Sequence, residues 1–312
     1  MSSATITRTP LTEHIGVELR GVELDQPLTG PVREALHDAW VEFGLVLIRN
    51  ALHSKEAHLG LSEVFGEMEP SATSFLNSVE NPYLMELRQT PHNPKARRYI
   101  VNGEERIGYI GWHWDQAFMP TIVRGAVLRM VQPAGAAGST GFIDGIAAYS
   151  RLSEEMKARI DSLEVVYEFN PAMEQNPGFP RDVVSLNGVP GKRNFPPVVH
   201  PLVITQPETG RKVLKLSPTH VRYVLGMDKD ESDALIAELA DVLTEDEYAY
   251  YHAWGPDDVI IWDNWRVIHC AAGVPEGVSR YGIRTTIAGD YDVGRYLDPG
   301  LDKNNPPDRF DD

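Results

Sequence analysis

The sequence is poor in cysteine and in basic charge. One of its 312 residues is a cysteine, Cys270, so an internal disulfide and a zinc site built from several thiolates are both excluded. Lys and Arg number 29 against 45 Asp and Glu, which gives a formal net charge of −16. Because binding of nucleic-acid phosphates needs clustered Lys and Arg, we expect no nucleic-acid partner.

Long apolar runs are also missing. The longest ones, such as residues 45–48 and 259–262, have the length of a strand and fall far short of the ~18 residues that a membrane helix needs. Residues 1–10 are polar and lack the apolar core of a signal peptide. We therefore expect no membrane partner and a cytoplasmic protein in a reducing compartment.

The common motifs for nucleotide binding and hydrolysis do not occur. No G-x-G-x-x-G opens a helix, and no G-x-x-x-x-G-K-[ST] is found, so the usual phosphate cradles are excluded. No H-E-x-x-H occurs, and residues 137–141 have Ala where a G-x-S-x-G nucleophile elbow has its first Gly. The apolar neighbours of Cys270 predict an inert buried thiol.

The chain does contain many short strand-like segments separated by Pro and Gly. A few helices interrupt them, near residues 31–43, 54–65, 153–160 and 230–243, and Ser54 is the predicted cap of the second. The turn residues 206–210, Gln-Pro-Glu-Thr-Gly, predict a β-hairpin. This pattern favours an antiparallel β core with added helices, such as a sandwich or a jelly roll. We expect one domain over residues 1–312. The proline-rich, irregular segment 170–200 is predicted to be a lid or an insert.

Residues that bind metals give the strongest functional signal. His113 and Asp115 are two residues apart, so on a strand they point to the same face and can bind one ion together. A second histidine, His269, ends another strand-like run, and Arg284 follows it on a strand that a loop could return to the same place. Two histidines, one carboxylate and an arginine that can clamp a carboxylate are typical of a non-haem Fe(II) oxygenase with an oxo-acid cosubstrate.

Several ordered motifs strengthen this interpretation. They are Gly16-Val17-Glu18-Leu19-Arg20-Gly21-Val22-Glu23-Leu24, Trp112-His113-Trp114-Asp115, Gly138-Ser139-Thr140-Gly141-Phe142 with Ala147-Ala148-Tyr149, His200-Pro201-Leu202-Val203, Pro207-Glu208-Thr209-Gly210-Arg211-Lys212, Trp262-Asp263-Asn264 with His269, and Arg280 with Arg284-Thr285-Thr286-Ile287-Ala288-Gly289-Asp290. On these motifs, nearly the whole chain resembles the TauD/TfdA family of Fe(II)- and 2-oxoglutarate-dependent dioxygenases. The resemblance implies a double-stranded β-helix core, of the jelly-roll or cupin-like kind, with flanking helices.

The resemblance also implies roles for single residues. His113, Asp115 and His269 would bind Fe(II) and form the catalytic centre. Arg284 would pair with the distal carboxylate of 2-oxoglutarate, and Thr140 would hydrogen-bond the same carboxylate. O2 would be the co-reactant, and 2-oxoglutarate would leave as succinate and CO2. The expected reaction is hydroxylation of a small organic acid, and the expected assembly is a homo-oligomer, a dimer or a tetramer.

The substrate is less closely specified. Arg280 matches a family position that can bind a sulfonate or a carboxylate. Taurine is not expected, because Ser71 and Tyr109 stand where the taurine enzymes have His and Asn. Tyr109, Trp112 and Trp114 would bring aromatic bulk near the iron, and Phe179 and Phe195 lie in the proline-rich segment. This aromatic lining suggests an acid that is larger and flatter than taurine.

Three alternatives stay open on the sequence alone. The same oxidative chemistry could give desaturation or cyclisation. The fold could belong to a cupin-like protein that binds metal without catalysis. A zinc hydrolase could use the same ligands, although no acid or base beside them stands out.

Overall fold

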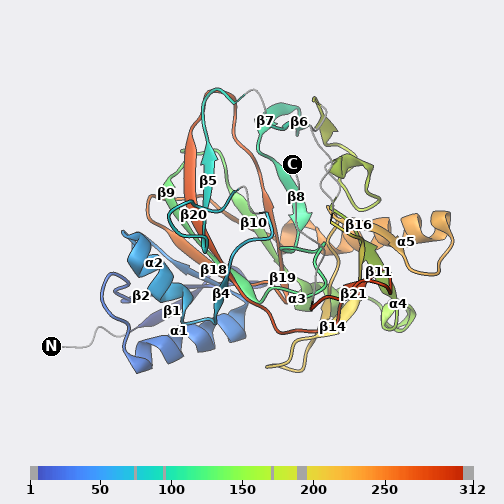
Figure 1. The fold of residues 1–312 in the computed structure, drawn as a ribbon, viewed down its shortest axis with the longest axis horizontal. Coiled ribbons are helices and arrows are strands. Elements are labelled where there is room, and N and C mark those ends of the chain that lie inside the picture. The colour runs from blue at the N-terminus through green and yellow to red at the C-terminus, as the bar shows by residue number, and fades with distance from the viewer. Residues whose placement is uncertain (1–5, 74–75, 94–95, 170–171, 188–194, 305–312) are drawn as a thin grey trace.

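Two facing β-sheets form the centre of the protein. The computed structural model describes residues 6–73, 76–93, 96–169, 172–187 and 195–304 (Figure 1). The larger sheet runs in the order β1-β2-β3-β18-β9-β20-β4, with β5 also paired to β20. Its strands are β1 Thr7–Pro10, β2 Val17–Arg20, β3 Leu45–Ile48, β4 Met68–Glu69, β5 Leu84–Gln89, β9 Gly125–Gln132, β18 Val259–Asp263 and β20 Arg280–Ile287.

The smaller sheet carries His113, Thr140 and His269, three of the predicted site residues. Its order is β17-β10-β19-β8, with β8 Ile110–His113, β10 Thr140–Asp144, β17 Tyr250–His252 and β19 Val267–Ala271. One apolar cluster joins both sheets, since it contains Leu128 and Ile260 from the larger sheet and Phe142 and Val267 from the smaller one. The core therefore lies between the sheets, as in a sandwich or jelly roll.

Three smaller sheets surround this core. The first, in the order β16-β11-β13-β21, comprises β11 Glu164–Tyr167, β13 Val198–Pro201, β16 Val221–Val224 and β21 Arg295–Tyr296. The second comprises β6 Arg98–Val101, β7 Glu104–Ile107 and β12 Val184–Ser185. The third is the hairpin of β14 Val203–Thr205 and β15 Lys212–Leu214, which confirms the hairpin expected at residues 206–210.

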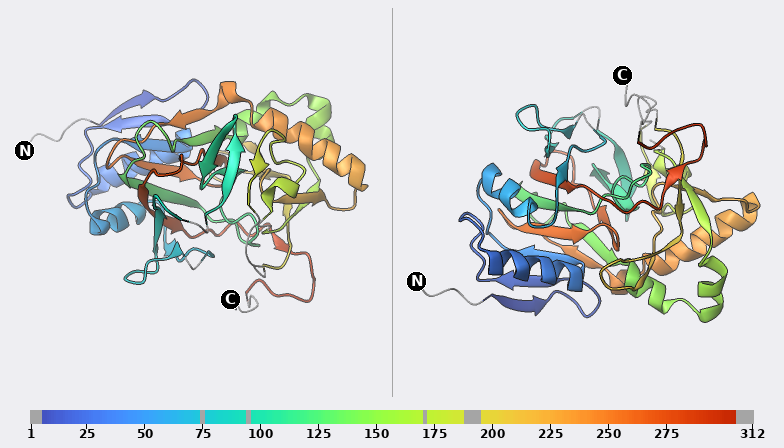
Figure 2. Two further views of the ribbon diagram at one scale, coloured as in Figure 1. Left: turned by 90° about the horizontal axis from the view of Figure 1, so that it is seen from above. Right: turned by 60° about the horizontal axis from the view of Figure 1, so that its bottom comes forward.

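Most of the helices lie at two ends of the molecule. Figures 1 and 2 show α1 and α2 on one side and α4 and α5 on the other. The helices are α1 Gly30–Phe43, α2 Lys55–Ser62, α3 Gly145–Arg151, α4 Glu154–Ile160 and α5 Lys229–Leu243, with short 3₁₀ turns at Met173–Gln175 and Asp246–Tyr248. The apolar face of α1, with Leu36 and Trp40, packs on the larger sheet at Val46 and Ile261. None of the helices that the structure describes is both long and apolar enough to cross a membrane.

Local sequence signals explain where these helices begin and end. Ser54 accepts a hydrogen bond from the Ala57 N–H (3.0 Å) and caps α2, as predicted. Helix α1 ends at Gly44, whose φ of 72° suits a residue without a side chain. A Cβ at Gly44 would also lie 2.8 Å from the Arg266 side chain. Gly44 therefore lets α1 end directly above the core strand β3.

The structure differs from the sequence predictions in several places. Strand β10 and helix α3, together Thr140–Arg151, were not predicted, because the strand lacks a clear alternation and the helix is short; its cap is Asp144, which accepts a hydrogen bond of 2.9 Å from the Ile146 N–H. Strand β20 begins at Arg280, earlier than expected, because it pairs with both β5 and β9. In segment 170–200, residues 170–171 and 188–194 lie outside the described residues. The described part adds β12 to β6 and so belongs partly to a sheet.

Candidate metal centre and active site

The candidate metal ligands come from two neighbouring strands and the turn that follows one of them. His113 is the last residue of β8, and its strand partner on β19 is His269. Because directly paired residues of antiparallel strands point to the same face, the two imidazole rings lie 4.2 Å apart between centroids. Asp115 follows two residues after His113 and joins them.

The three side chains converge on one point. Oδ1 of Asp115 lies 3.4 Å from Nε2 of His269 and 4.0 Å from Nε2 of His113. One potential ligand atom from each residue lies within 4.8 Å of the other two. Among the residues that the structure describes, this is the one group of three or more such side chains with this geometry. The expected grouping of these three residues is therefore present.

The protonation of His113 suits metal binding. Its Nδ1 lies 2.8 Å from the carbonyl oxygen of Gly111, which can only accept, so Nδ1 donates and Nε2 keeps its lone pair. Burial, together with the nearby His269, lowers the pKa of His113 well below its usual value. His113 is therefore neutral at physiological pH, which is the form that binds a metal ion.

Asp115 is held as a carboxylate with one oxygen facing the histidines. Burial by itself raises its pKa, but the charge of Arg284 and the neighbouring His269 together bring the pKa below its usual value. Oδ2 lies 2.7 Å from Nη2 of Arg284 and accepts a hydrogen bond of 3.2 Å from Nε1 of Trp262. Oδ1 is the oxygen left for a metal ion.

This donor set fits Fe(II). Two imidazole nitrogens and one carboxylate oxygen on one side of an ion form the arrangement that non-haem Fe(II) oxygenases use. The arrangement leaves the other coordination positions to small molecules. The absence of a second carboxylate or a thiolate among the three ligands argues against a closed structural zinc site.

Thr140 lies beside Arg280. Nη2 of Arg280 is 3.5 Å from Oγ1 of Thr140, and the same oxygen accepts a hydrogen bond of 2.9 Å from Nε1 of Trp254. Burial lowers the pKa of Arg280 to about 10, which leaves it a cation at neutral pH. The sequence paired Thr140 with Arg284. The structure instead pairs Thr140 with Arg280 and places Arg284 at Asp115, because the two arginines are four residues apart on β20.

The aromatic residues expected near the metal are not all there. Gly141 is next to Phe142 on β10, and Cys270 is next to His269 on the paired strand β19. Gly141 and Cys270 therefore face the side of the sheet opposite to His269. Trp112 packs on that opposite side, since a Cβ at Gly141 would lie 2.8 Å from both its ring and the Cys270 sulfur. The structure thus does not bring Trp112 to the ligand face. Trp114 packs in the core against Tyr167 and His200, with ring centroids 5.4 and 5.1 Å away.

Tyr109 and Ser71 also lie outside the group of ligand atoms. Tyr109 packs with Tyr99 and Phe179 in a separate aromatic cluster. Ser71 lines a cavity of about 510 Å³ whose wall includes Gln116, the residue after Asp115. The Gln116 side-chain oxygen accepts a hydrogen bond of 3.2 Å from the Ala72 N–H, so Ser71 borders the turn that carries Asp115.

Other residues near the ligands were not found from the sequence. The ring of His220 lies 5.8 Å from that of His113, and Phe118 lies 5.5 Å from His220. Burial lowers the pKa of His220 to about 4. His220 and Trp254 stand in segments without a recognisable motif, so no sequence signal pointed to them. Cys270 is a buried thiol, as predicted, and burial raises its pKa to about 12.

Comparisons with known proteins agree with this geometry. The model of the family described as taurine catabolism dioxygenase TauD, TfdA family, matches residues 7–286. The chain belongs to this family. It is 28% identical over 281 residues to an (S)-phenoxypropionate/alpha-ketoglutarate-dioxygenase of Sphingobium herbicidovorans, covering 90% of this chain and 94% of that protein. It is 27% identical to an alpha-ketoglutarate-dependent sulfate ester dioxygenase of Pseudomonas putida, covering 91% and 90%.

A solved structure supports the fold. A taurine dioxygenase from Burkholderia xenovorans superposes with a TM-score of 0.73 at 26% identity, covering 94% of this chain and 96% of the other. The predicted family, jelly-roll fold and enzyme class are thereby confirmed. The protein is a dioxygenase that depends on Fe(II), on 2-oxoglutarate (α-ketoglutarate) and on O2.

Proposed function

We propose that the enzyme oxidises a small organic acid whose anionic group pairs with Arg284, while Arg280 and Thr140 hold the distal carboxylate of 2-oxoglutarate. One observation carries the proposal. Arg280 and Arg284 point from the same strand into the site, one beside the Thr140 hydroxyl and the other beside Asp115. Four residues on a strand span roughly 13 Å, so the two cations can serve two different anions.

His113, Asp115 and His269 would hold the iron. Bound Fe(II) supplies the redox chemistry that couples decarboxylation of 2-oxoglutarate to oxidation of the substrate. The chain's own contribution is position and charge. Thr140 offers a hydroxyl and Arg280 a guanidinium to one carboxylate, a combination that fixes the orientation of a dicarboxylate. Arg284, whose side chain is 12% exposed, offers a second charge close to the ligand Asp115.

The pocket favours a substrate with an apolar or aromatic body. Phe118, Phe169 and Phe195 form a cluster with ring centroids 4.3 to 5.3 Å apart. Ala72 and Met119 belong to the same cluster and also line the cavity that contains Ser71. An aromatic cluster that adjoins this cavity suits the apolar body of an aryl or alkyl acid better than a small polar acid. The phenoxypropionate and sulfate ester relatives make such acids the first candidates to test.

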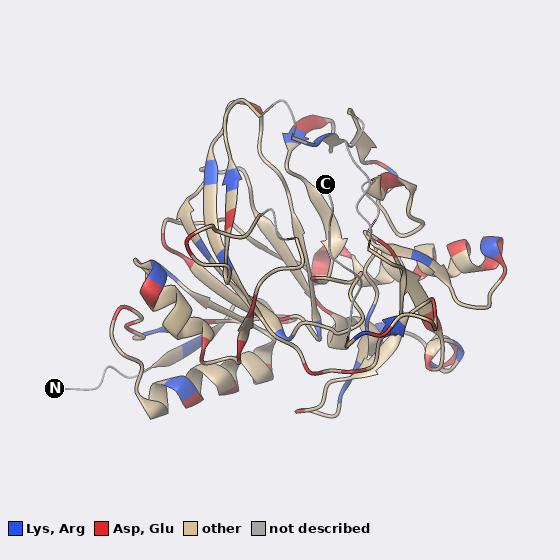
Figure 3. Ribbon diagram, viewed as in Figure 1, with Lys and Arg blue, Asp and Glu red and all other residues tan. Residues whose placement is uncertain are grey.

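Further expectations accompany this proposal. Phe195 reaches the cluster from segment 170–200, which supports a role of that segment in covering the substrate. Lys and Arg are interspersed with Asp and Glu over the ribbon (Figure 3), which supports the expectation of no nucleic-acid partner. A cytoplasmic location, a single domain and a homo-oligomeric state remain predictions.

Anaerobic addition of 2-oxoglutarate to the Fe(II)-loaded protein tests the centre. Chelation should give a weak visible charge-transfer band, and His269→Ala should abolish it. A panel of aryloxy acids, alkyl sulfates, sulfonates and aliphatic carboxylates should then be screened for stimulated succinate formation. Iron-loaded, folded protein without the band would contradict the metal site. Stimulation by taurine alone would contradict the proposed substrate class.

A further inference from the structure

The turn after β18 forms hydrogen bonds to the main chain of Asp115. Asn264 is fully buried, and its side-chain oxygen accepts a hydrogen bond of 2.7 Å from the Asp115 N–H. Its side-chain nitrogen donates to the carbonyl oxygens of Asp115 (3.3 Å) and Val123 (3.0 Å). One amide therefore holds both polar groups of the peptide backbone at Asp115.

The same turn also holds the Asp115 side chain. Trp262, two residues before Asn264, donates its Nε1–H to Oδ2 of Asp115 at 3.2 Å. This contact leaves Oδ1 toward His113 and His269. Backbone and carboxylate of Asp115 are thus fixed by two side chains from one tripeptide, Trp262-Asp263-Asn264.

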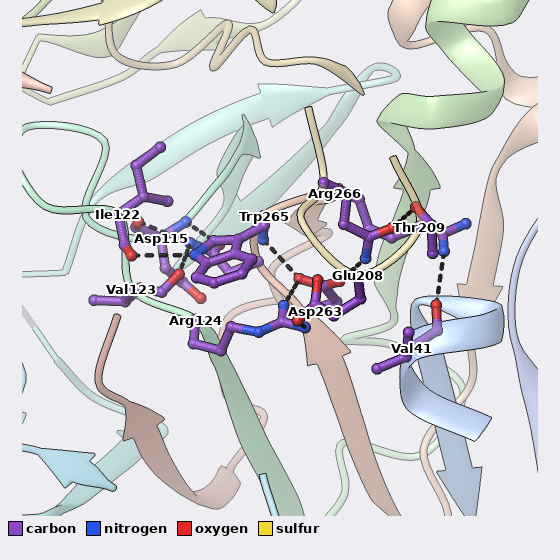
Figure 4. Close-up of polar contacts among 12 residues, drawn as sticks. Val41, Asp115, Ile122, Val123, Arg124, Glu208, Thr209, Asp263, Trp265 and Arg266 are labelled. Carbon is purple, nitrogen blue, oxygen red and sulfur yellow. Dashed lines mark hydrogen bonds and ion pairs between the residues drawn. The ribbon is translucent and has the colours of Figure 1, made fainter. Parts of the chain in front are cut away.

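The tripeptide is itself anchored from behind. The Asn264 N–H donates to the Arg124 carbonyl at 3.0 Å, and the ammonium of buried Lys215 donates to the Asn264 carbonyl. Asp263, which lies between Trp262 and Asn264, forms an ion pair with Arg124 and accepts a hydrogen bond from the Trp265 N–H. Figure 4 shows Asp115, Val123, Arg124, Asp263 and Trp265 in this network. Its members are buried, so the turn has little room to move.

We propose that Asn264 and Trp262 are positioning residues that set the orientation of Asp115 before a metal ion binds. The inference rests on the proposed role of Asp115 as a ligand. A metal ligand that is already oriented loses less conformational freedom on binding, and outer contacts of this kind typically change metal affinity about 10- to 100-fold. Trp262-Asp263-Asn264 is one of the motifs that carry the family resemblance, but the resemblance assigned no role to its residues.

Calorimetric titration of the full-length, metal-free protein with Mn²⁺ tests the inference. Asn264→Ala should weaken Mn²⁺ binding by about 10- to 100-fold, and Trp262→Phe should weaken it less, because it removes one contact to Oδ2. The free energy of unfolding of each metal-free variant is measured in parallel. A merely structural role would lower that free energy and leave the Kd of the folded protein unchanged.

Asn187→Ala is the matched control. Like Asn264, Asn187 uses both side-chain groups to bind main-chain atoms. Its oxygen accepts a hydrogen bond from the Arg98 N–H, and its nitrogen donates to the Ala96 carbonyl, each at 2.9 Å. Neither Arg98 nor Ala96 is one of the three candidate ligands. Asn187→Ala should therefore leave the Mn²⁺ Kd as in the wild-type protein.

The outcomes separate the inference from the metal site itself. Wild-type protein that binds no Mn²⁺, or Asp115→Ala that binds it equally well, would overturn the ligand assignment. Intact wild-type binding with unchanged Kd in Asn264→Ala and Trp262→Phe would overturn the positioning role alone. If Asn264→Ala does not fold, the Mn²⁺ Kd values of Asn264→Asp and Trp262→Phe test the positioning role instead. Asp at position 264 keeps the acceptor for the Asp115 N–H and loses the donors to the Asp115 and Val123 carbonyls. Wild-type affinity in both of these variants would likewise overturn the role.

Discussion

Nη2 of Arg280 lies 3.5 Å from the hydroxyl oxygen of Thr140, which makes this arginine, and not Arg284, the cationic neighbour of Thr140. Trp254 donates to the same hydroxyl oxygen, so the Thr140 proton is free to point toward a bound anion. Arg284 contacts Asp115 instead. The two arginines therefore have different neighbours, and their substitution should have different consequences.

Arg280→Gln should weaken 2-oxoglutarate binding. A charged hydrogen bond to a carboxylate contributes about 1.5–3 kcal/mol, so the 2-oxoglutarate KM should rise about 10- to 150-fold. The KM of the primary substrate should change little, because Arg280 faces Thr140 and not Asp115. Succinate formation at varied concentrations of each compound measures both values. A rise confined to the primary-substrate KM would contradict the assignment.

Arg284→Gln should show the opposite pattern. Loss of its charge should raise the KM of the acidic substrate by a similar factor, with a smaller effect on 2-oxoglutarate. It should also raise the pKa of Asp115, because the charge of Arg284 is the largest influence that lowers it. Succinate formation measures both KM values of Arg284→Gln, which are then compared with those of Arg280→Gln. Equal loss of 2-oxoglutarate affinity in both variants would mean that the arginines share one anion.

Much of the site was predictable because its ligands follow strand periodicity and ordered motifs. His113 and Asp115 are two residues apart, and His269 closes a strand-like run, so their convergence needs only that β8 and β19 pair. The family resemblance supplied the long-range pairing that no local pattern contains. The hairpin of β14 and β15 was likewise found from its turn residues.

The different neighbours of Arg280 and Arg284 could not be predicted, because they depend on registers between distant strands. Four residues along β20 decide which arginine meets Thr140 on β10 and which meets Asp115 beyond β8. The side that Trp112 faces, by contrast, follows from strand alternation alone, because adjacent residues such as Trp112 and His113 on β8 point to opposite faces of the sheet. Contacts such as Trp254 to Thr140 join residues more than a hundred positions apart.

Trp254→Phe should weaken 2-oxoglutarate binding moderately. The variant keeps an aromatic ring in the core and removes the Nε1–H that Thr140 accepts at 2.9 Å. Without this donor the hydroxyl can rotate away from the bound carboxylate, and one hydrogen bond is worth about 1 kcal/mol, or about fivefold in KM. The 2-oxoglutarate KM measures the effect, with Trp265→Phe as a control, since its Nε1–H donates to the Ile122 carbonyl instead. Equal KM values in both variants would contradict the prediction.

His58 should make stability fall in mild acid. It is fully buried beside the Thr285 hydroxyl at 3.2 Å, and burial, aided by the charge of Arg129, lowers its pKa to about 3. Because the unfolded state binds the proton first as the pH falls, the stability due to neutral His58 is complete above about pH 6.5 and is lost toward pH 3. From pH 7 to pH 5 this linkage amounts to about 2 kcal/mol. Urea unfolding of the wild-type protein and of His58→Gln at both pH values measures it, and an identical pH dependence in the two proteins would contradict the prediction.

Gly60→Ala should stabilise the protein. Gly60 lies inside α2, and a Cβ built there meets no atom within 4 Å, so alanine adds helix propensity without a clash. The expected gain in the free energy of unfolding is about 0.5–1 kcal/mol. Gly210→Ala is the matched control, since it is equally open but has a φ of 67°, which alanine disfavours by about 1–2 kcal/mol. Urea unfolding should therefore shift in opposite directions for the two variants. A shift to lower stability in both would mean that α2 needs glycine for a reason other than space.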